Sequence, residues 1–177
     1  MNKPNILAIV GSMNADSINA RIIHKLKISY GHLINIDVYE DIASLPHFSP
    51  HLDTDNAPES VVHLRELLTR ADGVLFCTPE YIFSLPSIVK NIFEWMVSTV
   101  IFTDKPSAFI IAASSGDKAF EQMQLMLTTV GAKMSLDSNV LIKGVKSKTT
   151  IDGDITDIET KTAIDKLIAA LVQNINK

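Results

Sequence analysis

Three short apolar runs constrain the fold of this chain more than any other feature. "ILAIV" (6–10), "GVLFCT" (73–78) and "SAFIIAA" (107–113) are almost free of polar residues. Strands have this composition when helices cover both faces of a parallel sheet. Weaker strand patterns occupy Leu33–Tyr39 and Ser135–Ile142, and stretches long enough for crossover helices separate the runs. The pattern predicts a doubly wound α/β fold, with five parallel strands in the order 2-1-3-4-5 and helices on both faces.

Length, charge and cysteine content narrow the class of protein. The 177 residues suit one domain, expected over 1–177, and a hydrophobic fraction of 46% argues against disorder. The net charge is −4 and no long basic cluster occurs, so we expect neither nucleic acid nor a membrane as partner. The first apolar run is too short to span a membrane. The single cysteine, Cys77, excludes an internal disulfide and fits a reducing cytoplasm.

Three further segments carry local signals. "TDIE" at 156–159 matches a capping box, and apolar residues then recur at helical spacing to the end of the chain. The segment Glu40–Ala57 holds two prolines, is followed directly by a third, and shows no clear period, which predicts a long loop. A helix from Ser87 to about Ile101 is apolar on more than one face. Its second face predicts either a homodimer interface or burial beneath the long loop.

Two unusual loops follow the first and third predicted strands. In the expected strand order, these two strands flank the crevice where ligands bind to open α/β sheets. "GSMNADSIN" (11–19) offers a sharp turn, short polar side chains and the start of a helix, which together favour an anion. It is neither a P-loop nor a three-glycine dinucleotide fingerprint. The simpler alternative is that Asp16 or Ser17 only caps the helix.

The second loop, "TPEYIFSLPS" (78–87), is stiffened by a proline on each side of "EYIFSL". Tyr81 and Phe83 could present aromatic surface to a flat ring system, with backbone amides serving its polar edge. Alternatively, both aromatic side chains pack into the core. Metal binding is not predicted, because His47 and His51 lie in a proline-rich loop with no Cys/His cluster. The cysteine, at the end of a buried strand, is expected to be a structural thiol.

Three segments resemble the NADPH-dependent FMN reductase family. "IVGSMNADSINARI" is similar to its opening Gly-Ser-x-Arg-x-x-Ser-x-Asn, and "LPHFSPHLD" to its Leu-Pro…Asp stretch. "ADGVLFCTPEYIFSLPSIVKNIFEW" resembles its Thr-Pro-Glu-Tyr-Asn-x-Ser-x-Pro-x-x-x-Lys-Asn-x-x-x-Trp signature. The resemblance, over roughly 5–145, implies a flavodoxin-like sandwich, bound FMN, and NADPH or NADH as reductant. It also implies a small-molecule electron acceptor such as a quinone or free flavin, and a homodimer or homotetramer.

The resemblance also implies where the cofactor binds. Ser12, Ser17 and Asn19 would correspond to phosphate-site residues, the strand-three loop would line the isoalloxazine, and the loop after strand four would complete the site. No side chain is implied as a catalytic acid or base. The cofactor-binding positions carried over are Ser12, Asn14, Ser17, Ile18, Asn19, Pro79, Glu80, Tyr81, Ile82, Ser84, Ser114, Ser115 and Gly116.

Three departures from the family pattern bear on cofactor affinity. Asn14 replaces the phosphate-site arginine, Ile82 replaces the asparagine after Pro-Glu-Tyr, and Asp117 and Lys118 stand where glycines are usual. A hydrogen bond to a charged group contributes roughly 1.5–3 kcal/mol, so loss of the arginine would weaken FMN about tenfold to a hundredfold. Asp16 adds a repulsion that solvent screens. Two hypotheses therefore stand: a ping-pong flavoenzyme, or a non-catalytic flavodoxin-like binding or regulatory protein. A third hypothesis is that the chain is a subunit of a larger assembly.

Overall fold

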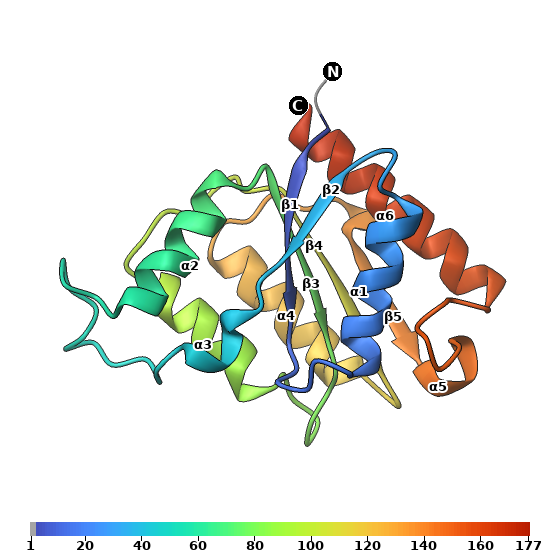
Figure 1. Ribbon diagram of the computed structural model, residues 1–177, viewed down its shortest axis with the longest axis horizontal. Helices are drawn as coiled ribbons and strands as arrows, with labels where there is room; N and C mark the ends of the chain where they lie inside the picture. Colours follow the sequence, from blue (N-terminus) through green and yellow to red (C-terminus); the bar gives the residue numbers. More distant parts are fainter. Residues whose placement is uncertain (1–2) are drawn as a thin grey trace.

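A computed structural model describes residues 3–177 and shows a five-stranded, fully parallel sheet in the order β2-β1-β3-β4-β5. The predicted fold class is therefore confirmed. All five strands point the same way, so their carboxyl ends share one edge, at the bottom of Figure 1. The strands are β1 (Asn5–Val10), β2 (Asn35–Val38), β3 (Gly73–Thr78), β4 (Ser107–Ala113) and β5 (Asn139–Lys143).

Helices cover both faces of the sheet and form two separate hydrophobic cores. The helices are α1 (Ile18–Ser29), α2 (Glu59–Arg70), α3 (Ser87–Met96), α4 (Asp117–Thr129), α5 (Val145–Lys148) and α6 (Ile158–Ile175). Helices α2, α3 and α4 contribute to one core, and α1 and α6 to the other. Figure 1 shows α2 and α3 on one side of the sheet and α1 and α6 on the other. Because β1, β3 and β4 contribute to both cores, they are apolar apart from their end residues Asn5, Thr78 and Ser107, as their sequences predicted.

Two predicted strands are shorter than expected, and one predicted cap is shifted. The second strand is confined to Asn35–Val38, and the 135–138 part of the fifth forms a short 3₁₀ turn with its own capping box. The predicted box at 156–159 is wrong by one residue, because Asp157 caps α6 by accepting hydrogen bonds from Thr160 N and Oγ1 at 2.9 and 2.6 Å. A carboxylate is the stronger partner for a helix N-terminus.

The predicted loop after β2 begins with a 3₁₀ helix, η1 (Asp41–Ser44), and is irregular over 45–58, where α3 holds it in place. Asn91 donates from Nδ2 to Pro46 O (2.9 Å) and accepts at Oδ1 from Phe48 N (2.8 Å). Trp95 Nε1 donates to the same carbonyl (2.8 Å), and its ring meets that of Phe48 edge-on. The asparagine and tryptophan of the family-like "KNIFEW" segment are thus structural residues that fasten the loop.

The second apolar face of α3 is buried within a single chain. Phe93, Trp95 and Met96 belong to the core that also takes up residues of the long loop, including Phe48 and Ala57. The helix ends at Met96, before the expected end near Ile101. The structure therefore favours the second interpretation of this face, burial beneath the loop.

Within residues 3–177, no helix is both long and apolar enough to cross a membrane. Nor does this part of the chain gather three or more His, Cys, Asp or Glu side chains in a metal-binding arrangement.

Candidate functional site

A cleft of about 370 Å³ lies at the carboxyl edge of the sheet, where the loops after β1, β3 and β4 meet. This is the position predicted from the strand order. The residues that line it are Ser12, Ser17, Ile18, Asn19, Pro79, Glu80, Tyr81, Ile82, Phe83, Ala112, Ala113, Ser114, Ser115 and Val145.

The loop after β1 is a compact turn that opens onto the start of α1. Gly11 permits it, because a Cβ there would lie 2.1 Å from Thr78 Oγ1 and 2.5 Å from the Val89 side chain. Asn14 Oδ1 accepts from Asp16 N (2.9 Å), an Asx turn that shapes the loop from within. Ser17 is the N-cap of α1 and accepts from Ala20 N (3.2 Å). The capping alternative is thus observed for Ser17.

Capping leaves several amides of this loop unused. Among residues 3–177, no acceptor pairs with the backbone N–H groups of Met13, Ala15, Ile18 or Asn19. The last two lie in the first turn of α1, where the helix dipole favours negative charge. The loop therefore caps its helix and also keeps unpaired donors for an anion.

The Asn19 side chain is engaged in internal hydrogen bonds. It is only 1% exposed, donates from Nδ2 to Ala112 O (3.3 Å) and accepts from Cys77 Sγ (3.3 Å). Its amide thus links the ends of β3 and β4 beneath the cleft. Burial raises the pKa of the Cys77 thiol, which agrees with the structural role predicted for it.

The loop after β3 forms a tight hairpin at the mouth of the cleft. Tyr81 and Ser84 exchange both backbone hydrogen bonds (2.9 and 3.0 Å), and the two residues between them each have φ of 51°. This is the geometry of a type I′ turn, which normally carries Asn or Gly. Ile82 and Phe83 fill it instead, at a cost of roughly 1–2 kcal/mol each. They are 96% and 72% exposed, and Tyr81 is 56% exposed, so Tyr81 and Phe83 both present aromatic surface outside the core, as predicted.

Glu80 projects from this loop onto the N-terminus of α4. Its carboxylate accepts from Gly116 N (3.0 Å), Lys118 N (3.1 Å) and Ala119 N (3.1 Å). Gly116 can present its amide because it adopts φ of +99°, a conformation that favours glycine. The carboxylate thus satisfies the first amides of α4 and is committed to structure.

Basic side chains near the loop after β4 form ion pairs with acidic residues that do not line the cleft. Lys118 Nζ pairs with Glu121 (2.7 Å) and Lys143 Nζ with Asp117 (2.8 Å). Hydrogen bonds from Lys143 and then from Ser115 hold the pKa of the Asp117 carboxyl below its usual value. No Lys or Arg lines the cleft in the described part of the chain, so amides and hydroxyls are its only donors.

Most of the predicted cofactor positions meet at this cleft, but three do not line it. Asn14 lies outside and shapes the first loop, Ser84 Oγ donates to Gln122 Oε1 (2.9 Å), and Gly116 donates to Glu80. Four lining residues were not predicted: Phe83, Ala112, Ala113 and Val145. The last three follow from topology, since they end β4 or come just after β5. Phe83 was noted in the sequence as aromatic surface but was not assigned to the site.

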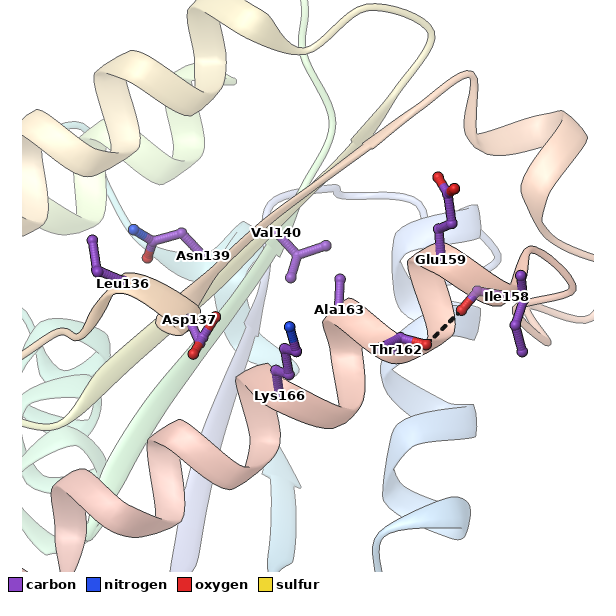
Figure 2. A pocket seen from close by; sticks show the side chains of 9 residues that line it. All are labelled: Leu136, Asp137, Asn139, Val140, Ile158, Glu159, Thr162, Ala163 and Lys166. Carbon is purple, nitrogen blue, oxygen red and sulfur yellow. Dashed lines mark hydrogen bonds between the residues drawn. The ribbon is translucent and has the colours of Figure 1, made fainter.

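A second groove of similar size, about 380 Å³, lies between the free edge of β5 and α6 (Figure 2). Its charged side chains, Asp137, Glu159 and Lys166, form no ion pair with one another within residues 3–177. Asn139 places it at the amino end of β5, the edge opposite to the ligand-binding edge of parallel sheets. Because the two volumes are nearly equal, the first cleft is identified as the candidate site by its place at the carboxyl edge of the sheet and by its unpaired amides and hydroxyls.

The strand order and the cleft at the switch between β1 and β3 define a flavodoxin-like α/β protein. Residues 4–146 match the family described as NADPH-dependent FMN reductase, and the chain belongs to that family. It is an oxidoreductase of the NAD(P)H-dependent flavin/quinone reductase type.

Individual relatives agree with this assignment over nearly their whole length. The NADH-dependent flavin reductase subunit 2 of Lactobacillus johnsonii is 34% identical, over 90% of this chain and 91% of its own. A 2-hydroxy-1,4-benzoquinone reductase of Burkholderia sp. is 30% identical, over 93% and 94%. The structure of FerB, a flavoenzyme NAD(P)H:(acceptor) oxidoreductase from Paracoccus denitrificans, superposes with a TM-score of 0.83 at 27% identity, covering 98% of this chain and 97% of its own.

Proposed function

We propose that this protein binds FMN in the cleft, with the phosphate at the start of α1 and the ring beside the Tyr81–Ser84 hairpin. The observation that carries the proposal is a set of backbone amides in the loop after β1 that are unpaired within residues 3–177. Those of Ile18 and Asn19 belong to residues that line the cleft, and those of Met13 and Ala15 precede them in the same loop. These donors match the acceptor oxygens of a phosphate, and Ser12 adds a hydroxyl. The donor set therefore fits FMN, although it lacks a cation.

The chain's own residues would position the flavin and its substrates rather than act as acids or bases. FMN, when bound, would supply hydride acceptance from NADPH or NADH and hydride donation to an acceptor. Within residues 3–177, Glu80 is the one carboxylate that lines the cleft, and its oxygens already accept hydrogen bonds from three backbone N–H groups. Tyr81 and the turn residues leave an open apolar rim, where a nicotinamide and an acceptor could lie in turn.

A quinone is the acceptor we propose. The rim consists of the exposed side chains of Tyr81, Ile82 and Phe83, which suits an uncharged flat molecule. The Burkholderia relative is named for reduction of a benzoquinone, which agrees with this class. A carboxylate-bearing acceptor would meet no cationic side chain among the lining residues.

We also propose that residues 1–177 form one domain and that the protein assembles as a homodimer or homotetramer. One sheet supports both hydrophobic cores, which favours a single domain. Val97 and Val100 are exposed beyond the end of α3, and Ile82 and Phe83 are exposed at the cleft. Such surfaces are often covered by a partner. Light scattering after size exclusion should give two or four chains per particle, and a monodisperse monomer would contradict the assembly.

Steady-state kinetics with NADPH and 1,4-benzoquinone test the shared site. If donor and acceptor use one face in turn, double-reciprocal plots at several quinone concentrations should be parallel. Intersecting lines would show that both substrates bind together and would overturn the shared-site mechanism. FMN binding without NADPH oxidation above that of free FMN would instead support the non-catalytic alternative.

A further inference from the structure

The Tyr81–Ser84 hairpin holds a conformation that its own sequence disfavours. Neither Ile82 nor Phe83 is a residue that readily adopts positive φ, and both side chains are exposed, so packing does not hold them there. Strained turns of this kind persist where the surrounding structure over-determines them. The source of that constraint must lie at the base of the hairpin.

Gln122, on the second turn of α4, contacts the base of the hairpin. Its Oε1 atom accepts from Ser84 Oγ (2.9 Å) and from the backbone N–H of Leu85 (3.0 Å). Leu85 is buried, so its amide has no water to replace this partner without cost. One side-chain oxygen therefore satisfies two donors on the C-terminal side of the turn.

Glu80 fixes the other side of the same turn to the same helix. Its three hydrogen bonds to the first amides of α4 lie one turn of helix before Gln122. The two side chains thus hold both ends of the hairpin against α4. Glu80, on the hairpin, accepts from amides of the helix, whereas Gln122, on the helix, accepts from donors of the hairpin. Glu80 belongs to the family-like motif, whereas Gln122 lies outside every motif noted in the sequence.

We infer that Gln122 is a positioning residue, which holds the hairpin in the conformation that the flavin site requires. This inference rests on the proposed function, since the hairpin lines the cleft where FMN would bind. Without the two hydrogen bonds, the strained turn would relax and move the backbone at Tyr81 and Ile82. The lining of the cleft would change although no cofactor contact had been removed directly.

The test compares Gln122→Met with Gln124→Met. Methionine keeps the length of the side chain but loses the acceptor, and Gln124 is an exposed glutamine on the same helix with no hydrogen bond of its own among the described residues. Amide hydrogen exchange of the FMN-free protein reports on the hairpin, and quenching of free FMN fluorescence gives the cofactor dissociation constant. Gln122→Glu, which retains the acceptor oxygens, is the rescue variant.

We expect Gln122→Met to speed exchange at Leu85 and to weaken FMN about tenfold, the size of two lost hydrogen bonds. Core amides of β3 and β4 should exchange as before, Gln124→Met should match the wild type, and Gln122→Glu should recover most of the FMN affinity. Unchanged exchange at Leu85, or faster exchange throughout the core, would overturn a local positioning role. Faster exchange at Leu85 with unchanged FMN affinity would overturn the link to the cofactor.

The two proposals fail in different ways. If the wild-type protein binds no FMN, the proposed function is wrong and the cofactor half of this inference falls with it. The exchange data, collected without FMN, would still decide whether Gln122 holds the hairpin.

Discussion

Restoring a cation to the loop after β1 should tighten FMN binding. No Lys or Arg of residues 3–177 lines the cleft, so the phosphate would meet only amides and hydroxyls there. Asn14→Arg places a guanidinium on the loop at the position where the family pattern has its arginine. Asn14 is exposed, and its side chain makes one hydrogen bond, to Asp16 N, so the fold should tolerate the change.

The expected gain follows from two opposing terms. One charge-assisted hydrogen bond contributes roughly 1.5–3 kcal/mol, and loss of the Asx-turn hydrogen bond costs about 0.5–1.5 kcal/mol. With the middle of each range, the net gain is about 1.3 kcal/mol, equivalent to roughly eightfold tighter binding. Since the new contact is electrostatic, the advantage should shrink as salt is raised.

Fluorescence titration of FMN at low and high salt measures this directly. Asn14→Gln is the matched control, because it alters the turn without adding charge and should bind FMN no more tightly than the wild type. Equal affinities for wild type and Asn14→Arg at low salt would refute the placement of the phosphate beside this loop.

Three further changes test the structure elsewhere. Ile82→Gly should relieve the positive φ and raise the free energy of unfolding by about 1 kcal/mol and the Tm by about 2–4 °C, and an unchanged or lower Tm would argue against strain. Asn91→Ala removes both hydrogen bonds to the loop after β2 and should cost about 1–3 kcal/mol in urea unfolding, with faster proteolysis of that loop. Desolvation raises the pKa of Asp53, but hydrogen bonds from Arg65 and Ser98 and the charge of Arg65 outweigh it and hold that pKa below its ordinary value. The stability from this pair is therefore present above about pH 4 and lost as pH falls through the lowered pKa, so Asp53→Asn should flatten the acid limb of a pH–stability profile.

The fold was predictable because the apolar runs reveal strands that helices cover on both faces. A strand covered on both faces must be apolar throughout, so β1, β3 and β4 were visible without any long-range information. The second strand, at the edge of the sheet, had weaker bounds, and the start of the predicted fifth strand became a 3₁₀ turn. The cap of α6 lies one residue later than predicted, because the Asp157 carboxylate accepts from Thr160 N at the start of the helix.

The location of the site was predictable, but the hydrogen-bond partners of its side chains were not. Asn19 and Glu80 have the polarity of ligand-binding residues, yet each is committed to internal hydrogen bonds. Those partners lie 36 or more residues away in the chain, so no local pattern reveals them. The same holds for Gln122, whose role depends on where α4 packs.

The most direct test of the central claim, that FMN binds in this cleft, is retention of flavin after desalting. Ser114 is exposed and lines the cleft, so Ser114→Trp should fill the site and spare the fold, and Ser29→Trp on α1 is the matched control. Wild type and Ser29→Trp, incubated with FMN and desalted, should keep flavin absorption bands that bleach on anaerobic addition of NADPH. Ser114→Trp should emerge colourless. Equal flavin retention by Ser114→Trp, or no retention by the wild type, would contradict the account.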